Sequence, residues 1–151
     1  MKKEDVEVML RIDSIVWNEL VSVLAAHPEE SLHAPASPKW TSRDVYVHMA
    51  RWINYSNKLI EAYCAGRTLP STEATPEEMN SRWQREDRGI ELNDAKEKAQ
   101  IVFSRRQRII ESIPLNRWDN KLDRIVRYDG ATHFAAHLNY IVVESNRRRV
   151  D

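Results

Sequence analysis

The sequence predicts an all-α fold, an antiparallel four-helix bundle formed by residues 1–151 as a single domain. Only three glycines occur in the 151 residues, and three of the six prolines lie between residues 28 and 38. Between these helix breakers, four stretches carry apolar residues at the spacing of an amphipathic helix. Few breakers and long periodic stretches favour helices of roughly 18 to 24 residues joined by loops, with a long crossover connection before the last helix.

The first helix is predicted from about Glu4 to Ala26. Its charged residues occupy one face, and its apolar stripe consists of Met9, Ile12, Val16, Leu20 and Leu24, widened by Val8, Ile15 and Trp17. The prolines between residues 28 and 38 cannot continue a helix, so they end it.

The second helix is predicted to begin after Thr41, because threonine is a good N-cap and Asp44 three residues later approximates a capping box. Gly66 stands where a C-terminal cap is expected. The apolar side between these ends is formed by Val45, Met49, Trp52, Leu59 and Tyr63.

Two more helices are expected in the middle of the chain. Thr75 followed by Pro76 is typical of a helix start and indicates a short extra helix. A long helix is predicted from Asn93 or Asp94 to Ile113, since a proline follows at position 114.

The C-terminal region is predicted to contain the last long helix. Residues 115–128 are expected to be irregular, or to hold a brief extended piece at 124–128 (RIVRY). Asp129 is expected to cap the final helix, which runs from Ala131 to about Arg148.

Composition narrows the classes of function. The net charge is zero, so the chain lacks the basic surface of a nucleic-acid-binding protein, and the terminal Arg147, Arg148 and Arg149 suit a solvated helix end. A lone Cys64 excludes an internal disulfide and fits a reducing compartment. No apolar run approaches the ~20 residues of a membrane span, and the charged start MKKEDVE lacks the apolar stretch of a signal peptide. We therefore expect a cytoplasmic protein without nucleic-acid or membrane partners.

Three histidines are candidate metal ligands. His133 and His137 are one helical turn apart, which lets two imidazoles reach one ion. His48 shares the inward side of its helix with Met49 and Trp52, and bundle cores build such sites from facing helices. The alternative is that these are core histidines bonded to carbonyl or carboxylate groups, because a buried imidazole needs a partner.

The stretch WTSRDVYVHMARW, residues 40–52, resembles the second-helix signature of the DinB/DfsB-like superfamily. The match consists of Trp40, a Ser/Thr cap, the Arg43-Asp44 pair and a histidine four residues later, followed by the aromatic Trp52. His133, Phe134 and His137 are similar to the pattern of the family's last helix, and Asn80 falls where many members have an asparagine. Leu138, Asn139 and Tyr140 replace the His-Arg-Gly-Gln run of the DNA-damage-induced branch, which favours the DfsB-like or mycothiol-dependent maleylpyruvate isomerase-like side.

This resemblance implies a divalent metal, zinc or nickel first, held by His48, His133 and His137. It also implies a small-molecule enzyme of detoxification type. Two reactions are implied, and both act on an electrophile. One is a transfer or isomerisation that uses a low-molecular-weight thiol, and the other is a hydrolysis. Three neutral imidazoles would leave one coordination position open for a water or a thiol.

Three side chains are candidates for moving protons in such a site. Tyr140 and Glu144 follow His137 by three and seven residues, and Tyr55 follows His48 by seven, so each can share a face with a ligand. Each also has a simpler interpretation, since tyrosines at such positions commonly pack and a glutamate commonly orients a ligand or is solvated. A non-catalytic helical-bundle binding or interaction protein is the alternative function, and a homodimer is expected for either.

Overall fold

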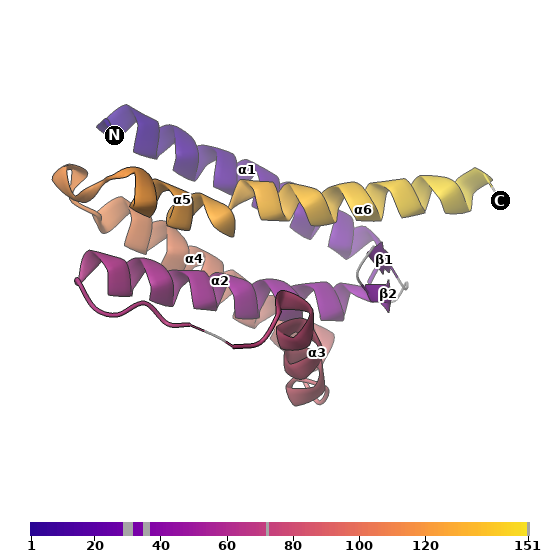
Figure 1. Ribbon diagram of the computed structural model, residues 1–151. Helices are drawn as coiled ribbons and strands as arrows, with labels where there is room; N and C mark the ends of the chain where they lie inside the picture. Colours follow the sequence, from indigo (N-terminus) through magenta and orange to yellow (C-terminus); the bar gives the residue numbers. More distant parts are fainter. Residues whose placement is uncertain (29–31, 35–36, 72, 151) are drawn as a thin grey trace.

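The computed structural model describes residues 1–28, 32–34, 37–71 and 73–150, and this part of the chain is mainly helical (Figure 1). The elements in chain order are α1 (Lys3–Ala26), β1 (Leu32–Ala34), β2 (Ser37–Trp40), α2 (Ser42–Cys64), α3 (Pro76–Glu86), α4 (Leu92–Ser112), the 3-10 turn η1 (Leu115–Arg117), α5 (Asn120–Tyr128) and α6 (Ala131–Val150). The all-α class is confirmed with one addition, the antiparallel two-stranded ribbon of β1 and β2 between α1 and α2.

The long helices pack in two pairs, α2 with α4 and α1 with α6, and α1 also meets α4. Figure 1 shows these four helices running side by side, with α3 at a steep angle to them beside α2, and α5 preceding α6 along nearly the same line. Within the described residues, no helix is both long enough and apolar enough to cross a membrane.

The core has two apolar parts. One is built around Trp17, Met49, Phe103 and Phe134, with the Trp17 and Phe103 rings stacked at a centroid distance of 4.7 Å. The other gathers the opposite ends of α1, α2 and α4 with α5, and consists of Val6, Met9, Ile60, Ile110, Ile113, Leu122 and Val126. On α1 and α4, the buried ion pair of Asp13 and Arg106 falls between residues of the two parts.

The buried stripe of α1 differs from the predicted one. Val8, Ile12 and Ile15 are about half exposed, whereas the buried residues are Val6, Met9, Asp13, Trp17, Leu20 and Leu24. The prediction of the stripe was wrong at these positions because Asp13 is polar. Asp13 lies at the centre of the inward face, where it pairs with Arg106. A face defined by apolar residues alone leaves Asp13 out and is therefore placed too close to Ile12.

Residues 120–128 are helical, so the expectation of irregular or extended structure there was wrong. The Asp119 carboxylate accepts a hydrogen bond from the Leu122 backbone N–H at 2.8 Å and starts α5. Leu122 and Val126, one turn apart, are fully buried, and this tertiary packing outweighs the β propensity of isoleucine and valine.

The predicted caps of α2 and α3 are confirmed. Thr41 and Asp44 form a capping box, as do Thr75 and Glu78. At the end of α2, Gly66 adopts a φ of 68°, a left-handed conformation that glycine adopts without strain, and its N–H donates to the Tyr63 carbonyl.

Candidate functional site

The structure brings His48, His133 and His137 together. Nε2 of His133 lies 3.1 Å from Nε2 of His48 and 3.2 Å from Nε2 of His137, and the three candidate ligand nitrogens lie within 4.8 Å of one another. His48 comes from α2 and the other two from α6. Residues 85 positions apart in the chain therefore converge on one point.

The position of His48 depends on how α2 begins. The Ser42 hydroxyl contacts two carbonyls at the end of α1, Leu24 at 3.1 Å and His27 at 2.7 Å. Arg43 donates to the carbonyls of Ile90 and Asp87, which follow α3. The first turn of α2 is thus fixed to two neighbouring segments, and His48 lies in the second turn.

The start of α6 is fixed by residues from two other helices. The Asp13 carboxylate accepts a hydrogen bond from the Ala131 N–H at 2.9 Å, while Arg106 binds Asp13 at 2.9 Å and the Val126 carbonyl at 2.7 Å. A Cβ on Gly130 would lie 2.5 Å from the Arg106 guanidinium, so only glycine fits there. This arrangement sets the start of α6, two residues before His133.

Asp129 has a different role from the predicted one. The prediction that it caps α6 was wrong, because the free N–H of Ala131 is bound by Asp13 from α1. Asp129 is buried, and its carboxylate lies 3.3 Å from Nδ1 of His133, a close contact that does not have hydrogen-bond geometry. The spacing of four residues between Asp129 and His133 was the available signal.

Burial favours the neutral form of two of the imidazoles, those of His48 and His137. Burial, followed by the neighbouring His133, lowers the pKa of His137 to about 3. The pKa of His48 also lies well below its usual value, because of burial first and then His137 and His133, although an interaction with Asn80 opposes the shift. Neutral imidazoles offer lone pairs to a metal, which protonated ones cannot do.

The cluster faces a pocket of about 540 Å³. Its walls come from α2, α3, α6 and the end of β2, and include Trp40, Trp52, Asn80, Thr132 and Tyr140. Trp52 donates to Asn80 at 2.6 Å and joins α2 to α3, and the Trp40 ring lies nearly parallel to the His137 ring at 6.2 Å. A small ligand entering this pocket would reach the histidine nitrogens.

Two features of the cluster fit a divalent metal ion. Nitrogen ligands at 2.0–2.1 Å from a tetrahedral ion lie roughly 3.3 Å apart, close to the two Nε2 separations of 3.1 and 3.2 Å. Within the described part of the chain, Nδ1 of His48 has no hydrogen-bond partner, and its Nε2 lies against Nε2 of His133. Each of these three imidazole nitrogens offers either one proton or one lone pair, so the three cannot all form hydrogen bonds with one another. A metal ion could accept a lone pair from all three.

The three predicted proton-moving residues have different positions. Tyr140 lines the pocket, with its ring perpendicular to that of His137 at 6.2 Å. The Tyr55 hydroxyl donates to the Pro70 carbonyl at 3.3 Å. Glu144 accepts from Arg148 at 3.4 Å and is not among the residues that line the pocket. The structure therefore brings only Tyr140 to the histidines.

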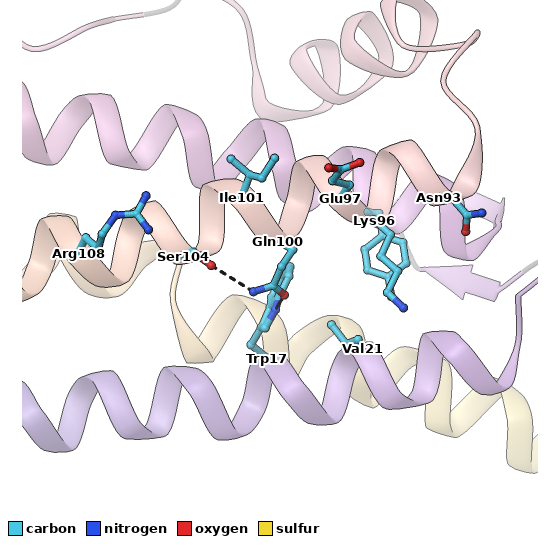
Figure 2. A pocket seen from close by; sticks show the side chains of 10 residues that line it. Trp17, Val21, Asn93, Lys96, Glu97, Gln100, Ile101, Ser104 and Arg108 are labelled. Carbon is cyan, nitrogen blue, oxygen red and sulfur yellow. Dashed lines mark hydrogen bonds between the residues drawn. The ribbon is translucent and has the colours of Figure 1, made fainter.

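A second groove, of about 440 Å³, lies between α1 and α4 (Figure 2). Three of the side chains that line it are hydrogen-bonded in a chain. Trp17 donates to Gln100 at 3.0 Å, and Gln100 donates to Ser104 at 3.2 Å, the contact drawn as a dashed line. The groove holds none of the described histidines or cysteines, so the histidine pocket is the stronger candidate site.

Comparison with protein-family models, with curated proteins and with solved structures found no match to this chain.

Proposed function

We propose that this protein is a metal-dependent small-molecule enzyme of the DinB/DfsB type, and that its helices form the antiparallel four-helix bundle of that superfamily. The observation that carries the proposal is the convergence of three imidazoles, those of His48, His133 and His137, on a ligand-sized pocket. A structural metal site is normally closed by four protein ligands, whereas three ligands and a cavity are the arrangement of a catalytic site. In the described residues, the group at this point consists of His48, His133 and His137 alone.

The proposed ion is zinc or nickel, since imidazole ligands suit both. When bound, it would lower the pKa of a coordinated water or thiol toward neutrality and so supply a nucleophile. The reaction we propose is attack on an electrophile, either as a thiol-dependent transfer or isomerisation or as a hydrolysis.

The side chains of this pocket divide the remaining tasks. His48 and His137 are held neutral by burial, and Asp129 lies beside Nδ1 of His133, where it can orient that ring as carboxylates do around metal-bound histidines. Tyr140 is the proposed proton-handling residue, because its ring borders both the pocket and His137. We place Tyr55 and Glu144 in supporting positions, given their contacts with Pro70 and Arg148.

The test is whether the metal has an open coordination position. Protein loaded with cobalt(II) is titrated with azide and with 2-mercaptoethanol while visible absorption is recorded. The proposal predicts that both ligands change the cobalt spectrum, and that the thiol adds a sulfur-to-cobalt charge-transfer band. His48→Ala should abolish the response, and His27→Gln, which alters a histidine outside the cluster, should preserve it.

A cobalt spectrum unchanged by either ligand would contradict an open position. The protein would then be better described as a non-catalytic helical-bundle binding protein. The homodimer and the cytoplasmic location stay predictions from the sequence.

A further inference from the structure

The outer wall of the histidine pocket is aromatic. Trp52 and Tyr140 stand beside the histidines, and Tyr128, at the end of α5, lines the same pocket with 72% of its surface exposed. The Tyr128 ring is therefore accessible to a ligand. The wall thus offers several π faces to a ligand.

The same pocket carries negative charge. Glu77, in the first turn of α3, and Asp129, between α5 and α6, are both among its lining residues. Glu77 is exposed and has no ion-pair or hydrogen-bond partner in the described part of the chain. The lining residues that the structure describes include two carboxylates and no lysine or arginine.

Aromatic faces and carboxylates attract the same kind of ligand. The face of a tryptophan or tyrosine ring is negative and binds cations, above all quaternary and protonated amines. A carboxylate without a cationic partner adds to that attraction and repels anions. We propose that the substrate or co-substrate of this pocket carries a cationic amine or quaternary ammonium group beside the atom that reaches the histidines. This inference rests on the proposed function, because it assigns the charge of the ligand at that same site.

Three thiols that differ only in the group at the far end test the proposal. Thiocholine ends in a trimethylammonium group, 3,3-dimethylbutane-1-thiol is its uncharged isostere, and 2-mercaptoethanesulfonate ends in an anion. Each is titrated into cobalt-loaded wild type, Glu77→Gln and Glu97→Gln, and the dissociation constant is taken from the charge-transfer band. Glu97 lines the groove of Figure 2, so its substitution changes the net charge equally without changing the pocket.

The quantity to compare is the ratio of the dissociation constants of two thiols, measured in wild type and in each variant. The thiols differ in acidity by the same amount in every variant, so that difference cancels when the ratios are compared. We expect Glu77→Gln to weaken thiocholine binding by about threefold to fivefold relative to its isostere, the effect typical of an exposed charge pair. Binding of 2-mercaptoethanesulfonate should strengthen, and Glu97→Gln should change the ratios by less than twofold.

The outcomes separate the inference from the proposed function. If all three thiols give the band and Glu77→Gln leaves their ratios unchanged, or if wild type prefers the sulfonate over thiocholine after correction for thiol acidity, the cationic ligand is wrong and the open metal site stands. If no thiol gives the band, the proposed function fails and the inference fails with it.

Discussion

Two buried polar clusters link the helices of this protein, and they differ in whether their charges are balanced. The first pairs the Arg106 guanidinium with the Asp13 carboxylate at 2.9 Å, and both side chains are almost completely buried. The second gathers His48, His133 and His137, three groups of the same kind that lie within contact distance of one another. The first cluster contains a cation and an anion, and the second contains only bases.

This difference indicates what each cluster is for. The Asp13 carboxylate accepts from Arg106 and from the Ala131 N–H, and Arg106 also donates to the Val126 carbonyl, so each charge of the pair is balanced within the chain, although Nη1 of Arg106 has no hydrogen-bond partner among the described residues. The histidine cluster leaves Nδ1 of His48 and Nδ1 of His133 without hydrogen-bond partners among the described residues, and its three members offer one another no opposite charge. A buried polar group without a partner costs free energy. We therefore expect the histidine cluster to bind a ligand that interacts with these nitrogens and removes the cost in free energy.

The largest expected effect comes from breaking the balanced cluster. Asp13→Ala would leave the buried Arg106 charge without its counterion, and we expect a loss of about 3 to 5 kcal/mol in the free energy of unfolding. Chemical denaturation of the metal-free protein measures it. Asp123→Ala removes the carboxylate of an exposed pair with Arg127 and should cost less than about 1 kcal/mol. Equal losses in the two variants would contradict the contrast between buried and exposed pairs.

Adding metal should stabilise the unbalanced cluster specifically. A ligand that binds only the folded state at 100 times its dissociation constant raises the free energy of unfolding by about 2.7 kcal/mol. We expect zinc or nickel to raise the melting temperature of wild type and of Asp123→Ala, and to leave His133→Ala unchanged. Thermal scans at several metal concentrations measure it, and a shift of equal size in His133→Ala would assign the metal to another place.

Acid should destabilise the metal-free protein through the histidines. The pKa of His137 in the folded state is about 3, below its ordinary value of 6.5, so the unfolded chain binds the proton first as the pH falls. The stabilisation is complete above pH 6.5 and is lost progressively toward pH 3. Between pH 6.5 and pH 5 the loss from this residue is about 2 kcal/mol.

The free energy of unfolding of metal-free wild type and His137→Asn, measured across that range, tests the sign. Wild type should fall more steeply than the variant. Parallel curves would mean that the folded protein protonates His137 as readily as the unfolded chain does.

The smallest effect should come from the residue beside the cluster. Asp129 lies 3.3 Å from Nδ1 of His133, and removing its charge in Asp129→Asn should weaken metal binding by about tenfold without abolishing it. Competition with a chromophoric chelator gives the affinity. An unchanged dissociation constant would show that Asp129 does not orient the ligand.

Much of this site could be predicted because its residues follow local rules. The capping box of Thr41 and Asp44 fixes where α2 begins and so which face His48 occupies. The spacing of His133 and His137 places both on one side of α6. Because His48 and this pair were each expected on the inward face of a helix, the sequence was sufficient to predict that the three histidines lie close together.

The parts that could not be predicted depend on contacts between distant residues. Asp13 and Arg106 are 93 positions apart, and nothing in either helix alone marks an aspartate or an arginine as buried. The helix of residues 120–128 forms because Leu122 and Val126 pack against α2 and its neighbours, which composition does not reveal. Asp129 was assigned to a cap because its sequence neighbours suggested one, whereas the cap comes from α1.

The most direct test of the central claim is the metal content of protein purified without an affinity tag, measured by plasma mass spectrometry. Wild type is compared with His48→Ala and His137→Ala, and circular dichroism checks that all three stay helical. The histidine cluster predicts about one equivalent of a divalent metal in wild type and a loss in both variants with helical content retained. Wild-type protein that holds no metal even after incubation with zinc or nickel would contradict it, and the three histidines would then be core residues.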